Sequence, residues 1–254
     1  MKKFLLLVFL ASTLASYAQK TNLVTVNTVK PKKGQKMAFE TAYKVHTAKF
    51  HKSTENVNVY EIMSGPNAGS YLISMGGRSF ADFDKERPDA GAHSLDLDKS
   101  FFPYLEETNN ATYRFYDTLS YNPDPKAEKF VVTIRYMKQG VNMADYRKES
   151  SRNIKVVKLL KGGFWENLSN AYYEKIWAGT SPVQITVRAL KDGFKSLEAD
   201  YYGVAPTGVP SFRDEYAKMY GHGDWDTRVK LLDTATERTE VYIMRLRKDL
   251  STGQ

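Results

Sequence analysis

Two residues on one helical stripe have the side chains best suited to acid–base chemistry. Residues 35 to about 52 follow a helical pattern. At about 100° per residue, four of its side chains fall on one line: Phe39, Tyr43, His46 and Phe50. An imidazole near a phenol could act as a base, a haem ligand or a hydrogen-bond donor in a pocket. A histidine at the edge of the core, bonded to a backbone carbonyl, is the structural alternative. His46 and Tyr43 are therefore catalytic candidates, and we expect His51, on the far side of the helix, to be solvated.

Two arginines in strand-like runs have the chemistry to bind an anion. Both runs alternate apolar and polar side chains, which places Arg135 and Arg188 on the polar faces. If these faces point into a cavity between two halves of the molecule, the guanidinium groups suit a carboxylate, which they bind through paired hydrogen bonds. The alternative is a surface or ion-paired arginine, with Glu61 or Glu174 as its partner.

A second helical run completes the set of ligand-binding candidates. Residues 141–161 repeat the pattern of the first long helix, and Ser150 and Asn153 fall near the positions that Tyr43 and His46 hold there. Their hydroxyl and amide groups can donate and accept hydrogen bonds. The predicted ligand-binding residues are Arg135, Arg188, Ser150 and Asn153.

Metal-binding and nucleotide-binding motifs are missing from the sequence. His222 and Asp224 could hold a metal, but no third ligand has a suitable spacing. Gly221 as a helix end and Asp224 as an N-cap account for this stretch without metal. There is no Gly-x-x-x-x-Gly-Lys, His-Glu-x-x-His, Gly-x-Ser-x-Gly or Gly-x-Gly-x-x-Gly. We therefore predict no metal site and no cofactor, and the sequence gives no signal for a kinase, a Rossmann enzyme or a hydrolase.

The first 18 residues have the order of a secretory signal peptide. Lys2 and Lys3 precede an apolar run, residues 4–10, and small residues precede an expected cleavage site before Gln19. The apolar run is shorter than the roughly 20 residues of a membrane span. We expect an exported protein, periplasmic or extracellular, with no stable membrane insertion after cleavage.

Composition and charge narrow the range of partners. The chain has 254 residues, 42% of them hydrophobic, and no cysteine, so it can build a core but has neither disulfides nor thiolate metal ligands. Its formal charge is +8, and basic residues are interleaved with acidic ones. Nucleic-acid binding usually concentrates positive charge on one face. We therefore expect no nucleic-acid partner, and a small acidic ligand fits better.

A short frame occurs twice and divides the chain into two similar units. Residues 34–38 (Gly-Gln-Lys-Met-Ala) and 140–144 (Gly-Val-Asn-Met-Ala) each follow a strand-like run and open a helix-like run. The next strand carries Tyr60-Glu61 in one copy and Tyr173-Glu174 in the other. We expect a first unit over 19–120, a linker over 121–129, and a second unit over 130–254 with an insertion near 200–210.

Each unit is predicted to contain a strand, a helix, two strands, a helix and a strand. In the first unit we expect strands at 23–29, 57–63, 70–75 and 112–119, and helices at 35–52, 79–85 and 95–107. In the second we expect strands at 130–137, 171–177, 182–189 and 239–247, and helices at 141–161 and 192–199. Two more helices are expected to be capped by Ser211 and Asp224.

This order of elements is the ferredoxin-like βαββαβ unit. Two such units in one chain, with the repeated Gly-x-x-Met-Ala frame, resemble the fused form of the dimeric α+β barrel superfamily, and most of all its NIPSNAP-like and antibiotic-biosynthesis-monooxygenase-like groups. The resemblance implies an α+β fold in which two tandem units form a pseudo-dimeric barrel with their sheets face to face. Members range from cofactor-free oxidation to haem breakdown to no known activity, so the fold implies no single function. Haem-degrading members also use an Asn and a Trp that have no match here, so no haem role passes to His46.

The sequence supports three classes of function. The leading hypothesis is a binding protein that holds a small, partly apolar ligand between its two units, and the strand arginines favour an anionic ligand. The alternative is an oxidoreductase of the same fold, cofactor-free or haem-using, with His46 and Tyr43 at its site. The third is a structural or interaction module without a pocket. The oligomeric state is left open.

Overall fold

A computed structural model describes residues 22–51, 56–124, 126–160, 165, 168–177, 181–197 and 211–252. The expected signal peptide, residues 1–18, and the expected insertion near 200–210 lie outside these described residues. Within them, no helix has the length and apolar character needed to cross a membrane.

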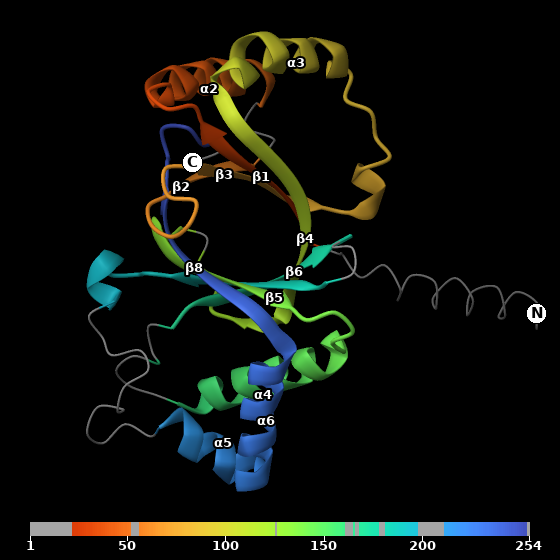
Figure 1. Ribbon diagram of the computed structural model, residues 1–254, viewed down its shortest axis with the longest axis vertical. Helices are drawn as coiled ribbons and strands as arrows, with labels where there is room; N and C mark the ends of the chain where they lie inside the picture. Colours follow the sequence, from red (N-terminus) through yellow and green to blue (C-terminus); the bar gives the residue numbers. More distant parts are fainter. Residues whose placement is uncertain are drawn as a thin grey trace, which may run out of the picture.

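The first unit has the predicted order of elements (Figure 1). These are β1 (Leu23–Pro31), α2 (Lys36–Phe50), β2 (Val57–Ile62), β3 (Tyr71–Arg78), α3 (Ala90–Asp96) and β4 (Leu105–Tyr121). A π-helical turn (Leu97–Phe101) and a 3-10 turn (Phe102–Tyr104) connect α3 to β4.

The second unit repeats this order and adds a helix. Its elements are β5 (Lys129–Met137), α4 (Met143–Leu159), β6 (Asn170–Ile176), β7 (Val183–Ala189), α5 (Phe212–Tyr220), α6 (His222–Ala235) and β8 (Thr236–Leu246). Ser211 caps α5 as predicted, because its Oγ accepts a hydrogen bond from the Asp214 backbone nitrogen at 3.1 Å. The prediction that Asp224 caps a helix is wrong: α6 already begins at His222, after a turn at Gly221 with a φ of 96°.

The strands of both units close into one antiparallel barrel, in the order β1-β3-β2-β8-β5-β7-β6-β4. Each unit keeps the ferredoxin-like strand order, and the units join where β2 pairs with β8 and β4 pairs with β6. Figure 1 shows α2 and α3 on one side of the barrel and α4, α5 and α6 on the opposite side. The predicted pseudo-dimeric α+β barrel is therefore confirmed, but the sheets meet edge to edge, which leaves no open sheet edge in the barrel.

The repeated frame marks the start of the long helix in each unit. Gly34 and Gly140 have φ angles of 77° and 80°, a region that glycine enters without strain. The turn at each glycine leads directly into α2 or α4. In the second unit the Asn142 side chain accepts a hydrogen bond from the Ala144 backbone nitrogen at 3.0 Å and caps α4. The frame recurs because both turns need the same backbone geometry.

The prediction of a helix over 95–107 is wrong at its end. β4 begins at Leu105 and extends to Tyr121, beyond both ends of the strand expected at 112–119. Its first part pairs with β1 and its last part with β6. Pairing with two neighbours around the barrel therefore overrides the local helical preference. The helix expected near 79–85 is a single 3-10 turn, Phe80–Asp82.

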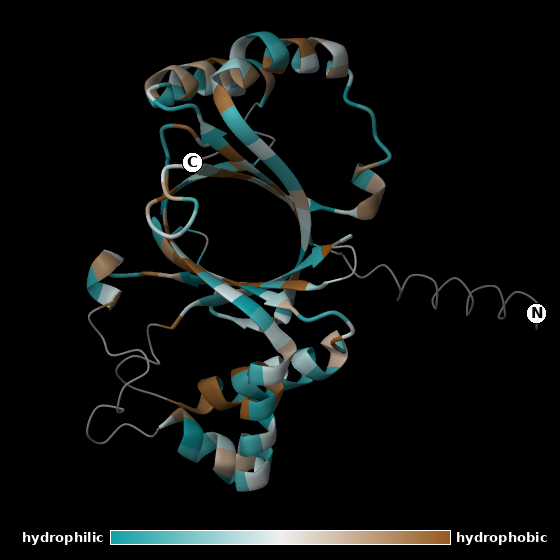
Figure 2. Ribbon diagram, viewed as in Figure 1, coloured by the Kyte–Doolittle hydropathy of each residue, from teal (hydrophilic) through white to brown (hydrophobic). Residues whose placement is uncertain are grey.

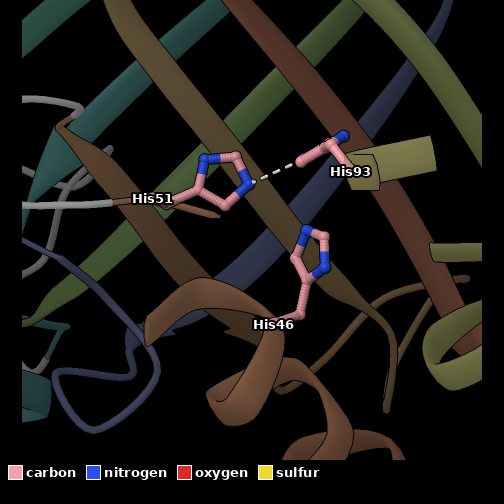
Figure 3. Close-up of side chains that lie close together, drawn as sticks. All are labelled: His46, His51 and His93. Atoms are coloured by element: carbon pink, nitrogen blue, oxygen red, sulfur yellow. Dashed lines mark hydrogen bonds between the residues drawn. The ribbon is translucent and has the colours of Figure 1, made fainter. Parts of the chain in front are cut away.

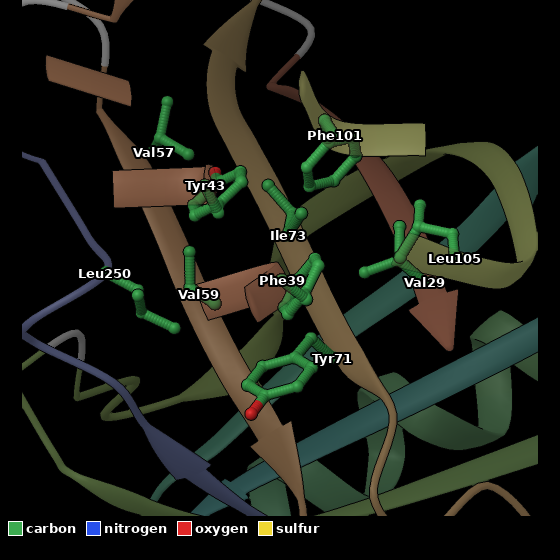
Figure 4. Close-up of a cluster of buried hydrophobic side chains, with 10 residues drawn as sticks. All are labelled: Val29, Phe39, Tyr43, Val57, Val59, Tyr71, Ile73, Phe101, Leu105 and Leu250. Atoms are coloured by element: carbon green, nitrogen blue, oxygen red, sulfur yellow. The ribbon is translucent and has the colours of Figure 1, made fainter. Parts of the chain in front are cut away.

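Alternation along the strands divides the side chains between the barrel lumen and the helices. On β1, Val26 and Thr28 face a cavity in the lumen, whereas Val29 packs under α2 in a buried cluster that includes Phe39 (Figure 4). Figure 2 shows hydrophilic and hydrophobic positions following each other along the barrel strands. The core therefore lies in layers, between the barrel wall and the helices of each unit and along part of the lumen.

Candidate functional site

Two cavities lie at opposite ends of the barrel lumen. We call the larger, of 440 Å³, the Gly76 cavity and the smaller, of 260 Å³, the Ala111 cavity, each after a lining residue. Strand β1 shows their separation: Val24 lines the Gly76 cavity, whereas Thr28 and Lys30, further along the strand, line the Ala111 cavity. Both units contribute to both cavities.

The Gly76 cavity has walls rich in aromatic rings. Four rings line it: Tyr60, Phe115, Phe130 and Tyr173. Tyr60 packs edge-on against Phe130 with ring centres 5.4 Å apart, and Phe115 lies 5.3 Å from Tyr173. Each of these pairs joins the first unit to the second. Such a lining suits a small, mostly apolar molecule.

The polar groups of the Gly76 cavity are largely uncharged at neutral pH. Asn58 and Ser74 line it, and burial raises the pKa of Tyr60 to about 12 and also raises the pKa of Tyr173. A phenol with a raised pKa stays protonated and can donate a hydrogen bond to a ligand oxygen. Asp124 is the one carboxylate among the described lining residues, which include no lysine or arginine.

The Ala111 cavity is smaller and carries charges of both signs. Lys30, Glu107 and Lys175 line it, and Lys30 forms an ion pair with Glu106 at 3.1 Å. Burial raises the pKa of Tyr113, another lining residue, to about 12. Aromatic rings line both ends of the lumen, but among the described lining residues only the Ala111 cavity has lysine side chains.

Arg135 lies on the outer face of the barrel wall, not in the lumen. Its Nη1 donates to Gln184 Oε1 at 3.0 Å and lies 3.4 Å from Thr186 Oγ1. Its charge also acts on Tyr146 of α4, the helix that covers this face. Arg188 shares the face of Gln184 and Thr186 on β7, and neither arginine is among the described residues that line the two cavities. The expectation that these polar faces point into a cavity between the units is wrong, because the apolar alternate residues face the lumen.

Ser150 and Asn153 make contacts within the helical layer of the second unit. Ser150 Oγ donates to the Tyr146 carbonyl oxygen, one turn earlier, at 3.0 Å. Asn153 Oδ1 accepts from Arg228 Nε at 2.9 Å, which ties α4 to α6. The Arg228 guanidinium lies 4.9 Å from the centre of the Trp225 ring, and burial lowers its pKa. Neither predicted residue lines the Gly76 or the Ala111 cavity among the residues described.

His46 and Tyr43 are buried between α2 and its neighbours, on the predicted stripe. His46 is 1% exposed and Tyr43 is 4% exposed. Burial raises the pKa of Tyr43 to about 12, and its ring centre lies 5.6 Å from that of Phe101. His46 Nδ1 lies 2.9 Å from Asp96 Oδ2, so its partner is a carboxylate and not the backbone carbonyl of the alternative interpretation. Neither residue borders the two lumen cavities.

Two further histidines meet His46, and the sequence did not identify them as candidates. The prediction that His51 is solvated is wrong: it is 9% exposed, because α2 ends at Phe50 and His51 leaves the helical path. His51 Nε2 lies 3.2 Å from Nε2 of His93 on α3. Figure 3 shows the three imidazoles gathered together. The close spacing of His46 and His51 is visible in the sequence. His93 joins them only because α3 packs against the end of α2, where the centre of the His93 ring lies 5.1 Å from that of the Phe50 ring.

The surroundings of His46 do not fit the haem-using alternative. A haem needs a flat slot beside the imidazole that ligates its iron. The His46 ring instead lies 5.1 Å from Phe50, 6.2 Å from Phe101 and 4.7 Å from His93, measured between ring centres. These neighbours occupy the space that the macrocycle would need.

No protein-family model and no curated protein matches this sequence. Solved structures do match it. A presumed monooxygenase from Lactobacillus acidophilus NCFM is 10% identical with a TM-score of 0.51, over 91% of this chain and 96% of its own. An anthrone oxidase-like protein is 12% identical with a TM-score of 0.51, over 93% and 96% of the two chains. A variant of chlorite dismutase from Candidatus Nitrospira defluvii is 8% identical with a TM-score of 0.51, over 91% and 94%. At these identities the likeness concerns the fold alone, which is a closed α+β barrel made of two ferredoxin-like units fused in one chain.

Proposed function

We propose that this protein binds a small, mostly apolar molecule in the Gly76 cavity, between its two units. The observation that carries the proposal is the aromatic lining shared by the units, with Tyr60 and Phe115 from the first and Phe130 and Tyr173 from the second. The cavity volume of 440 Å³ falls within the range of about 300–1,000 Å³ that is usual for small-molecule sites. Buried rings of this kind contribute binding energy through the apolar area they cover.

The lining favours a neutral ligand over an anionic one. The preference for an anion rested on Arg135 and Arg188, which lie outside the lumen face. The described lining of the Gly76 cavity has no cationic side chain, and the carboxylate of Asp124 repels an anion. Asn58, Ser74 and the phenols can instead bond to a hydroxyl or carbonyl of the ligand.

We also propose that the protein acts outside the cytoplasm. Residues 1–18 support export to the periplasm or the cell exterior, with no stable membrane insertion once they are removed. The interleaved charges support a small-molecule partner and not a nucleic acid.

Two matched variants and two matched probes test the Gly76 cavity by isothermal titration calorimetry. Gly76→Leu fills this cavity without backbone strain, because a Cβ there meets only Val24 Cγ2, at 3.8 Å. Ala111→Phe fills the other cavity and is the control. Naphthol is a neutral aromatic probe, and naphthoate is its anionic counterpart at pH 7.

With the chain from Gln19 onward, we expect naphthol to bind more tightly than naphthoate. Gly76→Leu should weaken naphthol binding about tenfold or more, a change of about 1.4 kcal/mol, whereas Ala111→Phe should change it by less than about twofold. Tighter binding of naphthoate, or equal weakening by both substitutions, would contradict the proposed site.

A second candidate is a cofactor-free oxidoreductase that acts on the ligand of the same cavity. The names of two structural neighbours, a presumed monooxygenase and an anthrone oxidase-like protein, favour it. His46 and Tyr43, which the sequence suggested as catalytic residues, do not border the Gly76 cavity. In an oxidoreductase that uses this cavity, the reaction would therefore take place beside Tyr60 and Tyr173. Oxygen uptake in the presence of naphthol that is lost in Gly76→Leu would support an oxidoreductase. If no oxygen is taken up, ligand binding is the only function that remains for this cavity.

A further inference from the structure

The cluster of His46, His51 and His93 has the composition of a metal site. The chain has four histidines, and three of them meet here, although His93 follows His51 by 42 residues. They come from α2, from the residue after it, and from α3. We propose that this histidine cluster binds one divalent transition-metal ion through its three imidazoles.

The spacing of the ligand nitrogens suits a single ion. All three lie within 4.8 Å of one another. The Nε2 atoms of His51 and His93 are 3.2 Å apart, close to the edge of about 3.3 Å that zinc–nitrogen bonds of about 2.0–2.1 Å give in a tetrahedron. A shift of the His46 nitrogen by less than about 2 Å is therefore enough to complete a face of that tetrahedron.

His46 presents one ring nitrogen to the cluster and the other to a carboxylate. Its Nδ1 lies 2.9 Å from Asp96 Oδ2, which leaves Nε2 for an ion. Figure 3 shows one nitrogen of His46 directed toward His51 and His93. Asp96 is itself fixed, because its Oδ1 accepts a hydrogen bond from Lys49 Nζ at 3.0 Å. A carboxylate behind the imidazole is the usual outer partner of a metal-bound histidine, so Asp96 is a positioning residue.

Burial favours the metal-binding form of two of the three imidazoles, those of His46 and His93. Desolvation lowers the pKa of His46 and lowers that of His93 to about 4, and the nearby charge of Arg87 adds to both shifts. The neutral imidazole is the ligating form. Arg87 would repel a cation, but it forms an ion pair with Asp89 at 2.8 Å, which offsets that repulsion.

Three imidazoles select the class of metal. Zn²⁺, Co²⁺, Ni²⁺ and Cu²⁺ bind imidazole well, whereas Mg²⁺ and Ca²⁺ prefer oxygen ligands. A four-coordinate ion held by three side chains keeps one position for water or another ligand. The histidine cluster is separate from the proposed ligand site, because none of its residues lines the Gly76 cavity. A failure to bind metal would therefore not count against ligand binding in the Gly76 cavity, and a failure to bind ligand would not count against the metal site.

A zinc titration tests the proposal, with a chain from Gln19 onward that carries no histidine tag. After treatment with a chelator, the protein competes with a chromophoric zinc indicator for Zn²⁺. We expect one Zn²⁺ per chain, and Co²⁺ should give the visible absorption of a four-coordinate site. His93→Gln should weaken Zn²⁺ binding more than Asp96→Asn, which acts through His46 and should weaken it roughly 10–100-fold.

His222→Gln is the matched control, because His222 is an exposed residue at the start of α6 in the second unit. Zn²⁺ should raise the Tm of the unmodified chain and of His222→Gln but not of His93→Gln. If His93→Gln alters the circular dichroism of the metal-free chain, His51→Asn takes its place. Absence of stoichiometric Zn²⁺ binding, or equal affinities of the cluster variant and His222→Gln, would overturn the proposal.

Discussion

Phe39→Ala is expected to lower the free energy of unfolding by about 3–5 kcal/mol, the range for loss of a buried aromatic ring. Phe39 is 0% exposed, and its ring centre lies 4.9 Å from that of Tyr71 on β3 and 5.4 Å from that of Phe101. Figure 4 shows this ring within the cluster that joins α2 to the barrel wall. Alanine leaves a cavity that the paired strands cannot close. Urea unfolding followed by far-ultraviolet circular dichroism measures the loss.

Phe102→Ala is the control for this substitution. Phe102 follows Phe101 in the chain but is 40% exposed, so its removal should cost less than about 1 kcal/mol. Equal losses in the two variants would show that α2 is not held to the barrel by its aromatic stripe.

Arg247→Met is expected to cost about 3 kcal/mol, because it removes the central cation of a half-buried network. Arg247 follows β8 and reaches three carboxylates. It lies 2.5 Å from Glu40 on α2, 2.9 Å from Asp249 and 3.5 Å from Glu61 on β2. A residue of the second unit is thereby tied to two elements of the first. The side chains of Glu40 and Glu61 are only 14% and 10% exposed, so methionine leaves them with fewer partners and little water. Urea unfolding at pH 7 measures the change.

The same variant should alter the response of the protein to acid. The hydrogen bonds from Arg247 lower the pKa of Glu40 below its ordinary value of 4.5 and lower the pKa of Asp249 below 3.8. A carboxyl group whose pKa is lower in the folded state stabilises the fold above its unfolded pKa, and this stability is lost as the pH falls through the folded value. The difference in unfolding free energy between the original chain and Arg247→Met should therefore be largest near pH 7 and shrink below about pH 4.5.

Lys248→Met is the control for the network. Lys248 pairs with Glu128, but these side chains are 55% and 60% exposed, and an exposed pair contributes about 0–1 kcal/mol. A pH-independent loss in Arg247→Met, or a loss no greater than in Lys248→Met, would contradict the role of the network at the junction between the units.

The order of elements could be predicted from the sequence because local signals determine most of it. Gly34 and Gly140 both need a positive φ, and each precedes the long helix of its unit. The start of β4 could not be predicted, because Leu105 enters a strand only through pairing with Pro31 of β1. The way in which the units join is likewise a property of the closed barrel, not of either unit alone.

The residues of the candidate sites were harder to predict from the sequence than the order of the elements. Alternation correctly placed Arg135 and Arg188 on the polar faces of their strands, but it cannot say which face of a strand points inward. Here helices cover the outer face, so both faces of the wall are protected, and on β5 and β7 the apolar residues face the lumen. The cluster of His46, His51 and His93 was missed because α3 brings His93 to the end of α2 from a distant part of the sequence.

Closure of the barrel between the two units is the central claim, because the Gly76 cavity exists only inside it. The natural chain has no cysteine, so paired cysteines can report on each junction. Ile62 faces Met244 across β2 and β8, and Thr112 faces Ile176 across β4 and β6. Directly paired strand residues have Cα atoms about 4.5–5.5 Å apart, within the range of a disulfide. Ile62 and Ile176 lie on strands that are not neighbours and provide the control pair.

The most direct measurement is the mass and gel mobility of the oxidised double-cysteine variants at low protein concentration. A closed barrel predicts that Ile62→Cys with Met244→Cys, and Thr112→Cys with Ile176→Cys, each form a disulfide within one chain, whereas Ile62→Cys with Ile176→Cys does not. Failure of either neighbouring pair to cross-link within the chain, while the control pair does so, would contradict the closed barrel and the ligand site inside it.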